Sequence, residues 1–351
     1  MDWKEFVPIY RKFISRKVAF CVLLLLGLCA LLIIAPVFGQ FKIPVGEVYD
    51  IILTHLSGGT VESYGKDRAV WGIRLPNAIT AVVVGFALGS CGAVMQSLLR
   101  NPLADPYTMG ISSGASLGAA LFFVMGISVL PFLSGDYAMI ANAFILSLIP
   151  TGIAILISCF RRMSTTAIIL AGIAVMYTFG AITSTIMLIA NPTQLSQVYM
   201  WNLGNIGTGS WGRIGLIVVL VAVCTSVLMV MNRKIDILTG SDDMAKTVGM
   251  NPMVCRMSLM VLISLMVAVI VSFTGTIGFI GLVGPHLARI FVGSSSRHLI
   301  PASGFTGAML LLISQCIAIN LGSLPIGVIT SLIGCPVFLA LLIKQRNSEW
   351  N

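Results

Sequence analysis

The chain has 351 residues, of which 57% are hydrophobic and 9% are charged, whereas about 25% of the residues of a typical soluble domain are charged. This composition excludes an ordinary soluble protein and predicts an all-α protein with many membrane-spanning helices. The net charge of +9 does not indicate nucleic-acid binding, because the basic residues lie between apolar runs and do not gather on one solvated face. We expect a lipid bilayer around the chain and no nucleic acid.

Ten apolar runs are candidates for membrane-spanning helices, each of which needs about 20 residues to cross the hydrocarbon layer. The first run is longer than the apolar core of a signal peptide, which has about 7 to 15 residues, so we expect a retained helix. Run 276–292 is short and rich in glycine, which makes it the weakest candidate. The predicted spans are residues 18–38, 77–98, 107–127, 138–159, 166–190, 212–231, 257–274, 276–292, 303–321 and 325–343.

Lysine and arginine are distributed unevenly between the two sides that ten spans define. Sixteen of the 21 basic residues fall on the side of the termini, and loops rich in these residues stay in the cytoplasm. Both termini are therefore predicted to be cytoplasmic, with residues 1–17 as an amino-terminal cytoplasmic segment. The sequence shows no linker or separate soluble domain, so we expect residues 1–351 to form one transmembrane domain.

Residues 100–106, with the sequence RNPLADP, interrupt the chain between the second and third spans. Pro102 and Pro106 prevent a continuous helix, and asparagine and aspartate favour turns. A tight cytoplasmic turn explains this pattern. The density of polar groups also indicates non-helical backbone that lines a cavity.

Residues 232–256 form a hydrophilic cytoplasmic segment with one short predicted helix. Ser241 or Asp242 can cap its start, acidic residues lie in its first turn, and Gly249 can end it. Its apolar residues have the spacing i, i+1 and i+4, which predicts one apolar side: Met244, Ala245 and Val248. A solvated loop helix is the alternative to a functional role.

Residues 275–301 combine glycines at every third position with a proline, a histidine and an arginine. Small residues let membrane helices approach closely, and this spacing winds around a helix, so we expect a packed and broken segment. His286 beside Pro285 is predicted to be a hydrogen-bonded structural residue and not a metal or haem ligand. The eight cysteines have no metal-ligand spacing, so no metal site is expected.

The sequence lacks the groups that two other functions need. It contains no phosphate-binding loop of the form G-x-x-x-x-G-K-S/T, so this chain is not expected to hydrolyse ATP. Its spans carry no acid, base and nucleophile set, which argues against a membrane enzyme and against a proton-driven carrier. An ion-coupled secondary transporter of a small solute stays as the alternative function.

Several motifs occur in an order that resembles the permeases of ABC importers for iron-siderophores, haem and cobalamin. The motifs are RLPN at 74–77, RNPLADP at 100–106, GISSGA at 110–115, WNLG at 201–204, the glycine-rich stretch from 275, and LPIGV at 324–328. The resemblance covers residues 74–343 and is specific because independent motifs share one order.

This resemblance implies an importer subunit that moves a ferric siderophore, or else haem or cobalamin, delivered by an extracytoplasmic substrate-binding protein. ATP and magnesium would belong to two separate ATP-binding subunits, with no cofactor in this chain. A second permease chain would complete the path. The complex would lie in the cytoplasmic (inner) membrane of a prokaryote.

The resemblance also implies roles for three groups of residues. The short helix would be a coupling helix that enters a cleft of the ATP-binding subunit, through Ser241, Asp242, Asp243, Met244, Ala245, Val248 and Gly249. The gate of the path would be formed by Asn101, Leu103, Ser164, Thr165 and Thr166. Outward bases would pair with acids of the binding protein, or else are simply solvated: Lys66, Arg68 and Arg74.

The sequence departs from the family at three charged positions. The family has an aspartate and an arginine in its ninth helix and a glutamate before its Leu-Pro-Val-Gly motif, where this chain has Gln315, Asn320 and Ser323. The arginine is a docking contact in some members. We therefore expect a second, different permease that retains the charges, with a homodimer as the alternative.

Overall fold

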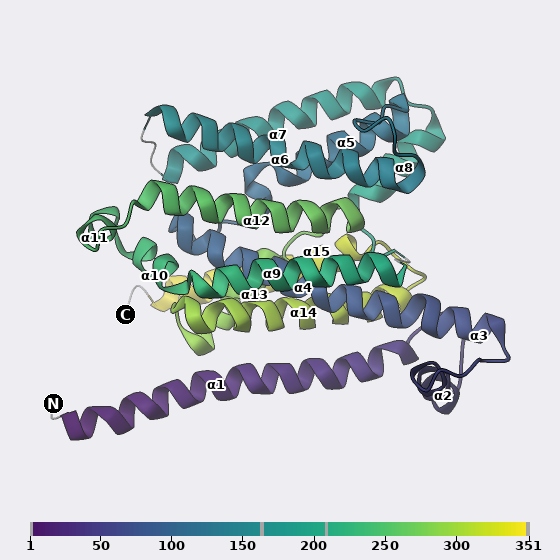
Figure 1. The fold of residues 1–351 in the computed structure, drawn as a ribbon, viewed down its shortest axis with the longest axis horizontal. Helices are drawn as coiled ribbons and strands as arrows, with labels where there is room; N and C mark the ends of the chain where they lie inside the picture. The colour runs from purple at the N-terminus through teal and green to yellow at the C-terminus, as the bar shows by residue number, and fades with distance from the viewer. Residues whose placement is uncertain (1–2, 162–164, 208–209, 349–351) are drawn as a thin grey trace.

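The computed structural model describes residues 3–161, 165–207 and 210–348, and every regular element in these ranges is helical (Figure 1). The longer helices are α1 (Trp3–Ile34), α4 (Leu75–Leu99), α5 (Ile111–Met125), α6 (Gly135–Arg161), α7 (Thr165–Leu188), α9 (Trp211–Val230), α12 (Pro252–Thr274), α13 (Ile280–Val292), α14 (Ser296–Asn320) and α15 (Ile326–Ser348). The shorter α-helices are α2 (Val45–Leu56), α3 (Tyr64–Ala69), α8 (Pro192–Asn202), α10 (Asn232–Gly240) and α11 (Asp242–Thr247). Two 3-10 turns, η1 (Ala35–Val37) and η3 (Pro106–Met109), and one π-helical turn, η2 (Val70–Arg74), complete these ranges.

Each of the ten predicted spans overlaps one of the longer helices. Within the described ranges, seven helices are long and apolar enough to cross a membrane: Ile14–Val37, Tyr64–Leu99, Gly135–Ile157, Thr166–Met187, Trp211–Val230, Pro252–Thr274 and Ser296–Asn320. Three shorter apolar helices correspond to the other predicted spans: Ile111–Met125, Ile280–Val292 and Ile326–Ala340. The all-α membrane architecture is confirmed, and a total of ten crossings stays a prediction.

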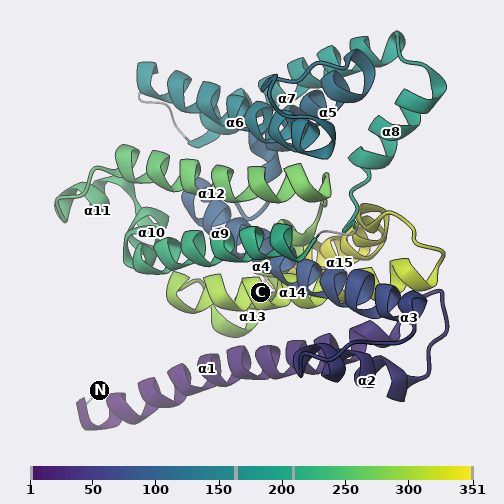
Figure 2. The same cartoon turned by 45° about the vertical axis from the view of Figure 1, so that its right-hand side comes forward.

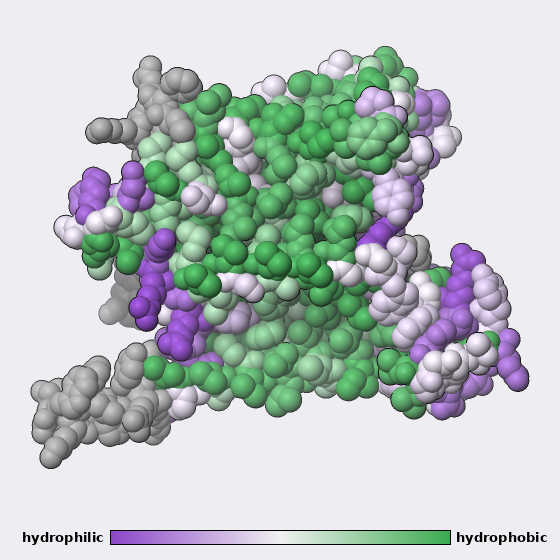
Figure 3. Space-filling model, viewed as in Figure 1, coloured by the Kyte–Doolittle hydropathy of each residue, from purple (hydrophilic) through white to green (hydrophobic). Residues whose placement is uncertain are grey.

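The molecule has a broad apolar band between two hydrophilic ends (Figure 3). One end carries α10, α11 and the start of α1, and the other carries α2 and α3 (Figure 1). We call them the α11 end and the α2 end. Only 11% of the apolar window of α1 is buried, so its hydrophobic side chains face outward, as a helix surrounded by lipid requires.

Helix α4 forms the centre of the bundle, and almost all of its side chains are buried. It packs closely on α14, where a Cβ on Gly89 would overlap the carbonyl oxygen of Ser303. Glycine allows this main-chain contact because it has no side chain. Helices α5, α6, α7 and α8 lie on one side of α12, and α1 lies on the opposite side (Figures 1 and 2).

Main-chain contacts also join three segments at the α2 end. Gly275 follows α12 with a φ of 67°, and a Cβ there would overlap the carbonyl oxygen of Trp201 in α8. A Cβ on Gly327 in α15 would overlap the carbonyl oxygen of Leu203. The chain after Gly275 stays non-helical until α13 begins at Ile280, which confirms the predicted packed and broken segment.

The hydrophilic stretch between the first two spans folds into α2, α3 and η2. Its small core consists of Ile43, Val48, Ile51 and Val70. These helices were not predicted from the sequence.

The turn after α4 folds back against the bundle. Asp105 caps η3, because its Oδ1 accepts the N–H of Tyr107 at 2.8 Å. The hydroxyl of Tyr107 accepts the N–H of Ile277, between α12 and α13, at 3.4 Å. Ala104, Asp105 and Pro106 are buried, whereas Pro102 and Leu103 are exposed. The second half of the turn is therefore packed among helices and its first half lies at the surface.

Candidate functional site

The short helix α11 has the boundaries that its capping residues predict. The Oγ of Ser241 accepts the N–H of Met244 at 3.0 Å and caps the start. Gly249 has a φ of 75°, and the N–H of Met250 donates to the carbonyl of Ala245 at 2.9 Å, which closes the end. Local residues therefore determine both ends of this helix.

The apolar residues of α11 do not share one exposed face, which corrects the prediction. Met244 is 54% exposed and Val248 is 58% exposed, whereas Ala245 is fully buried. Neighbouring residues of a helix are about 100° apart, so Ala245 faces the chain's own helices while Met244 and Val248, one turn apart, face outward. The exposed apolar face consists of Met244 and Val248 alone.

Asp242, the first residue of α11, binds two arginines from other helices. Its Oδ1 accepts Nη2 of Arg100 at 2.6 Å and Nη2 of Arg256 at 3.0 Å. These charge-assisted bonds hold the pKa of Asp242 below its ordinary value, and the hydrogen bond from Arg256 is the largest cause. The carboxylate is thus charged and fixed at the α11 end.

Each arginine also binds a carbonyl in the last turn of a helix. The Nε of Arg100 donates to the carbonyl of Leu238 in α10 at 2.9 Å, and the Nε of Arg256 donates to the carbonyl of Leu98 in α4 at 3.1 Å. Such carbonyls have no partner within their own helix. We call these four bonds the Asp242 brace, which joins α4, α10, α11 and α12.

The predicted gate residues Asn101 and Leu103 follow Arg100 directly. Arg100 ends α4 with a φ of 49°, a left-handed conformation. The Oδ1 of Asn101 accepts the N–H of Leu103 at 2.9 Å, and Leu103 is 48% exposed. The structure therefore brings the turn and the short helix together through one residue, Arg100.

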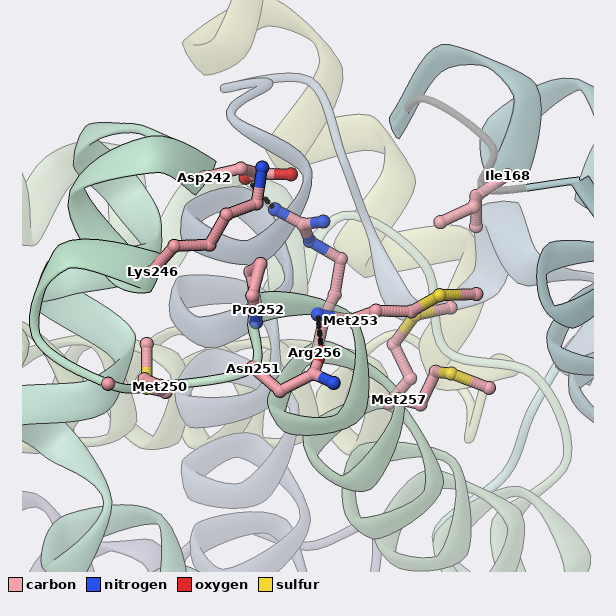
Figure 4. Close-up of a pocket in the computed structure, with 11 residues that line it drawn as sticks. Ile168, Asp242, Lys246, Met250, Asn251, Pro252, Met253, Arg256 and Met257 are labelled. Carbon is pink, nitrogen blue, oxygen red and sulfur yellow. Dashed lines mark hydrogen bonds and ion pairs between the residues drawn. The ribbon is translucent and has the colours of Figure 1, made fainter.

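A cavity of about 690 Å³ lies beside Asp242, between α11, α12 and the start of α7 (Figure 4). Figure 4 shows Arg256 extending from α12 toward Asp242, with Lys246 on the same side. Thioether side chains dominate another part of the lining, from Met250, Met253, Met257 and Met260. The cavity is therefore charged near α11 and apolar along α12.

The helix that follows the second predicted gate segment borders the same cavity. Ser164 lies outside the described residues, Thr165 begins α7, and Thr166 is exposed. Ile168, in the first turn of α7, lines the cavity. The start of α7 thus faces the Asp242 region.

Arg74 does not present its charge at the surface, which corrects its predicted docking role. It is 6% exposed. Its guanidinium donates to the carbonyls of Pro36, Val37 and Phe41. Arg74 therefore ties the end of α1 to the start of α4 and is not available to another protein.

The other two outward bases lie on α3 at the α2 end. Lys66 pairs with Glu47 of α2, and its side chain remains 37% exposed. Arg68 is exposed and donates to the hydroxyl of Tyr64 at 3.4 Å. Both charges can be reached by another protein.

The three positions that lack the family's charges are engaged within this chain. Gln315 is 6% exposed and shares with Ser323 a cavity of about 420 Å³ at the α2 end. The hydroxyl of Ser323 accepts Nε2 of Gln40 at 3.1 Å, and Nδ2 of Asn320 donates to the carbonyl of Cys316 at 2.9 Å. Uncharged side chains thus occupy these three positions.

His286 of α13 is held by packing. It is 3% exposed, and its ring meets the ring of Phe338 edge-on at a centroid distance of 6.2 Å. Its Nδ1 has no hydrogen-bond partner among the described residues. The predicted structural environment is present, and the predicted hydrogen bond is not made by Nδ1.

Arg100 and Arg256 were not predicted from the sequence as partners of Asp242. Arg100 is 142 positions from Asp242 along the chain. The available signals are an arginine after a helix end and an acid at a helix start. Neither signal identifies the other as its partner.

Comparison with known proteins identifies the family. The FecCD transport family matches residues 24–344. The hemin transport system permease of Yersinia pestis is 36% identical over 301 residues, which cover 84% of this chain and 90% of that protein. The vitamin B12 import system permease of Citrobacter koseri is 35% identical over 280 residues, which cover 79% of this chain and 83% of that protein. A solved metal-chelate type ABC transporter in an inward-facing conformation is similar with a TM-score of 0.81 and 26% identity, over 92% of this chain and 98% of that chain. This chain therefore belongs to the FecCD transport family.

Proposed function

We propose that this chain is the transmembrane permease of an ATP-driven importer for a ferric siderophore, haem or cobalamin. Membership of the FecCD transport family supports a transport role. The named relatives, which import hemin and vitamin B12, support a large chelate as cargo. The cargo passes between two permease chains in the cytoplasmic membrane of a prokaryote, and a substrate-binding protein delivers it.

The exposed face of α11 is the observation that carries this proposal. Met244 and Val248 are exposed one helical turn apart, on a helix whose first residue is fixed by two arginines. An anchored helix with exposed apolar residues suits insertion into a groove of another protein. We assign that groove to a separate ATP-binding subunit, which holds ATP and magnesium, and we assign the α11 end to the cytoplasm.

Lys66 and Arg68 are the bases that we propose for contact with the binding protein. They lie at the α2 end, which we assign to the outer side, and their side chains are accessible. Their partners would be carboxylates, because paired opposite charges steer association.

The test is transport in vesicles that contain this chain, its ATP-binding subunits and its partner permease. We expect the loaded binding protein to stimulate ATP hydrolysis, and uptake to require ATP. Uptake that follows a proton or sodium gradient and ignores ATP would reject the proposal in favour of an ion-coupled transporter.

An ion-coupled transporter would need a buried acid, so the role of Asp105 is relevant to this alternative. Asp105 is the only buried carboxylate among the described side chains. It caps η3 by accepting the N–H of Tyr107. The carboxylate of Asp105 therefore has a structural role as the cap of η3.

A further inference from the structure

Arg100 connects the turn that is predicted to form part of the gate with α11, the helix that we assign to contact with the ATP-binding subunit. It follows α4 and precedes the turn of Asn101 and Leu103, and its Nη2 binds Asp242 of α11 at 2.6 Å. The Nε of the same guanidinium donates to the carbonyl of Leu238 in α10 at 2.9 Å. One side chain therefore links the turn to both helices of the 232–256 segment.

The backbone of Arg100 is itself unusual. A φ of 49° is uncommon for a residue with a side chain and costs energy relative to an ordinary helical conformation. The two side-chain bonds of Arg100 stabilise this conformation. The shape of the turn and the position of α11 are thus coupled at this residue.

The two arginines of the Asp242 brace differ in accessibility. The side chain of Arg256 is 7% exposed, so its bonds are little screened by water. The side chain of Arg100 is 32% exposed and that of Asp242 is 44% exposed, so water screens this bond more strongly. Arg256 is therefore the more buried partner of Asp242, and Arg100 is the partner that lies beside the turn.

The charged side chains of the Asp242 brace match the partial charges at the ends of the helices that they bind. The carbonyl ends of α4 and α10 carry partial negative charge and receive the two guanidiniums, while the amide end of α11 carries partial positive charge and receives Asp242. A shift of α11 away from the end of α4 opposes the attraction between Asp242 and Arg100. While the pair with Arg100 holds, α11 and the end of α4 move together.

We propose that Arg100 is a positioning residue that transmits the movement of α11 to the turn of Asn101 and Leu103. This inference rests on the proposed function, in which α11 meets the ATP-binding subunit. Displacement of α11 moves Asp242, Asp242 pulls Arg100, and the turn follows because Arg100 is its covalent neighbour. Without the charge of Arg100, Arg256 still holds α11 on α12 and on Leu98 of α4. In that case α11 still meets the ATP-binding subunit, but its direct link to the residue that begins the turn is lost.

The test compares Arg100 with Arg100→Gln in the complete transport complex in vesicles. One readout is ATP hydrolysis, and a second is ATP-driven uptake of haemin, cobalamin or a ferric siderophore. The third readout is the rate at which a water-soluble maleimide labels Leu103→Cys, measured with and without magnesium and ATP. The labelling of the native cysteines, measured in the chain without this substitution, is subtracted. Leu103 suits this label because it is 48% exposed and lies in the turn itself.

We expect Arg100→Gln to leave ATP hydrolysis nearly unchanged and to lower uptake about tenfold, as for the loss of one charge-assisted hydrogen bond. ATP should change the labelling of Leu103→Cys only when Arg100 is present. Arg297→Gln is the matched control, because it removes another exposed arginine, at the start of α14. This control should behave as the unsubstituted chain does.

Each other outcome is decisive. Unchanged uptake and unchanged ATP-dependent labelling in Arg100→Gln would overturn the inference and leave the proposed function intact. An equal fall in ATP hydrolysis and uptake would mean that Arg100 acts in assembly, which also overturns it. Absence of ATP-driven uptake with Arg100 present would instead reject the proposed function.

Arg100→Lys provides a second variant if Arg100→Gln does not assemble. A lysine keeps the charge for Asp242 but lacks the forked donors that also bind Leu238. Uptake should therefore lie between the values for arginine and glutamine. A lysine variant no better than glutamine would contradict the role of the ion pair.

Discussion

Gly92 of α4 and Gly281 of α13 touch main chain to main chain, because a Cβ on Gly92 would overlap the carbonyl group of Gly281. On its other side, a Cβ on Gly281 would lie 2.8 Å from Oδ2 of Asp105. Helix α4, helix α13 and the turn after α4 therefore meet where no additional side chain fits.

Gly92→Ala is expected to force α4 and α13 apart and to destabilise the protein by about 1–3 kcal/mol or more. Thermal unfolding of the purified chain in detergent measures this effect. Gly215→Ala in α9 is the control, because a Cβ there meets no atom within 4 Å and alanine favours a helix. Equal melting temperatures for the two variants would contradict the close contact at Gly92.

Asp242→Asn is expected to weaken the protein in a pH-dependent way. The arginines lower the pKa of Asp242 in the folded state, so its carboxylate stabilises the fold at neutral pH, and this contribution is lost as the pH falls through the lowered pKa. The difference in melting temperature between wild type and Asp242→Asn should be largest near neutral pH and should shrink below about pH 4.

Asp243→Asn is the matched control for that series. The side chain of Asp243 is 89% exposed and pairs with Lys246, so its removal should change the melting temperature little at any pH. A pH-independent difference for Asp242→Asn would mean that the charge of Asp242 does not stabilise the fold.

Arg74→Lys is expected to lower stability by about 1–3 kcal/mol, because one ammonium group cannot reach all the carbonyls that the guanidinium binds. The affinity for the binding protein should not change, because Arg74 is buried. Arg68→Lys, at an exposed position of α3, is the control and should leave stability unchanged. A stable Arg74→Lys variant with weaker binding of the partner would restore the docking role.

Purification from cells that express the neighbouring transport genes is expected to yield a complex with a second, different permease. Gln315 and Ser323 are uncharged, and Ser323 is already bonded to Gln40, so this chain lacks the family's charged contacts at the α2 end. The subunit composition can be measured by mass spectrometry of the intact complex. Two copies of this chain with no second permease would refute the heterodimer.

Features that depend on neighbouring residues could be predicted from the sequence. The start of α11 depends on Ser241 and Met244, and its end depends on Gly249, so a window of a few residues was sufficient. The apolar runs likewise gave the positions of the long helices. The exposed face of α11 could not be predicted in this way, because the burial of Ala245 depends on how α11 packs on the other helices.

Features that depend on distant residues could not be predicted. Arg74 appeared to be an outward base, yet its acceptor in Pro36 is 38 positions away and becomes its neighbour only after α1 and α4 have packed. The partner of Asp242 in α4 is 142 positions away. The short helices between the first two spans could not be predicted, because their small core is formed jointly by α2, η2 and Ile43, which precedes α2.

The glycine contacts at the α2 end hold α8, the end of α12 and the start of α15 together through main-chain atoms. No side chain at Gly275 or Gly327 can rotate to release these contacts. In the proposed transport cycle, any rotation of α12 about Gly275 would produce a displacement that grows with distance from that residue. Helix α12 has 23 residues, a length of about 35 Å, so a rotation of about 5° at Gly275 moves Pro252 by about 3 Å. A small rotation at one surface of the membrane thus becomes a displacement of atomic size at the other.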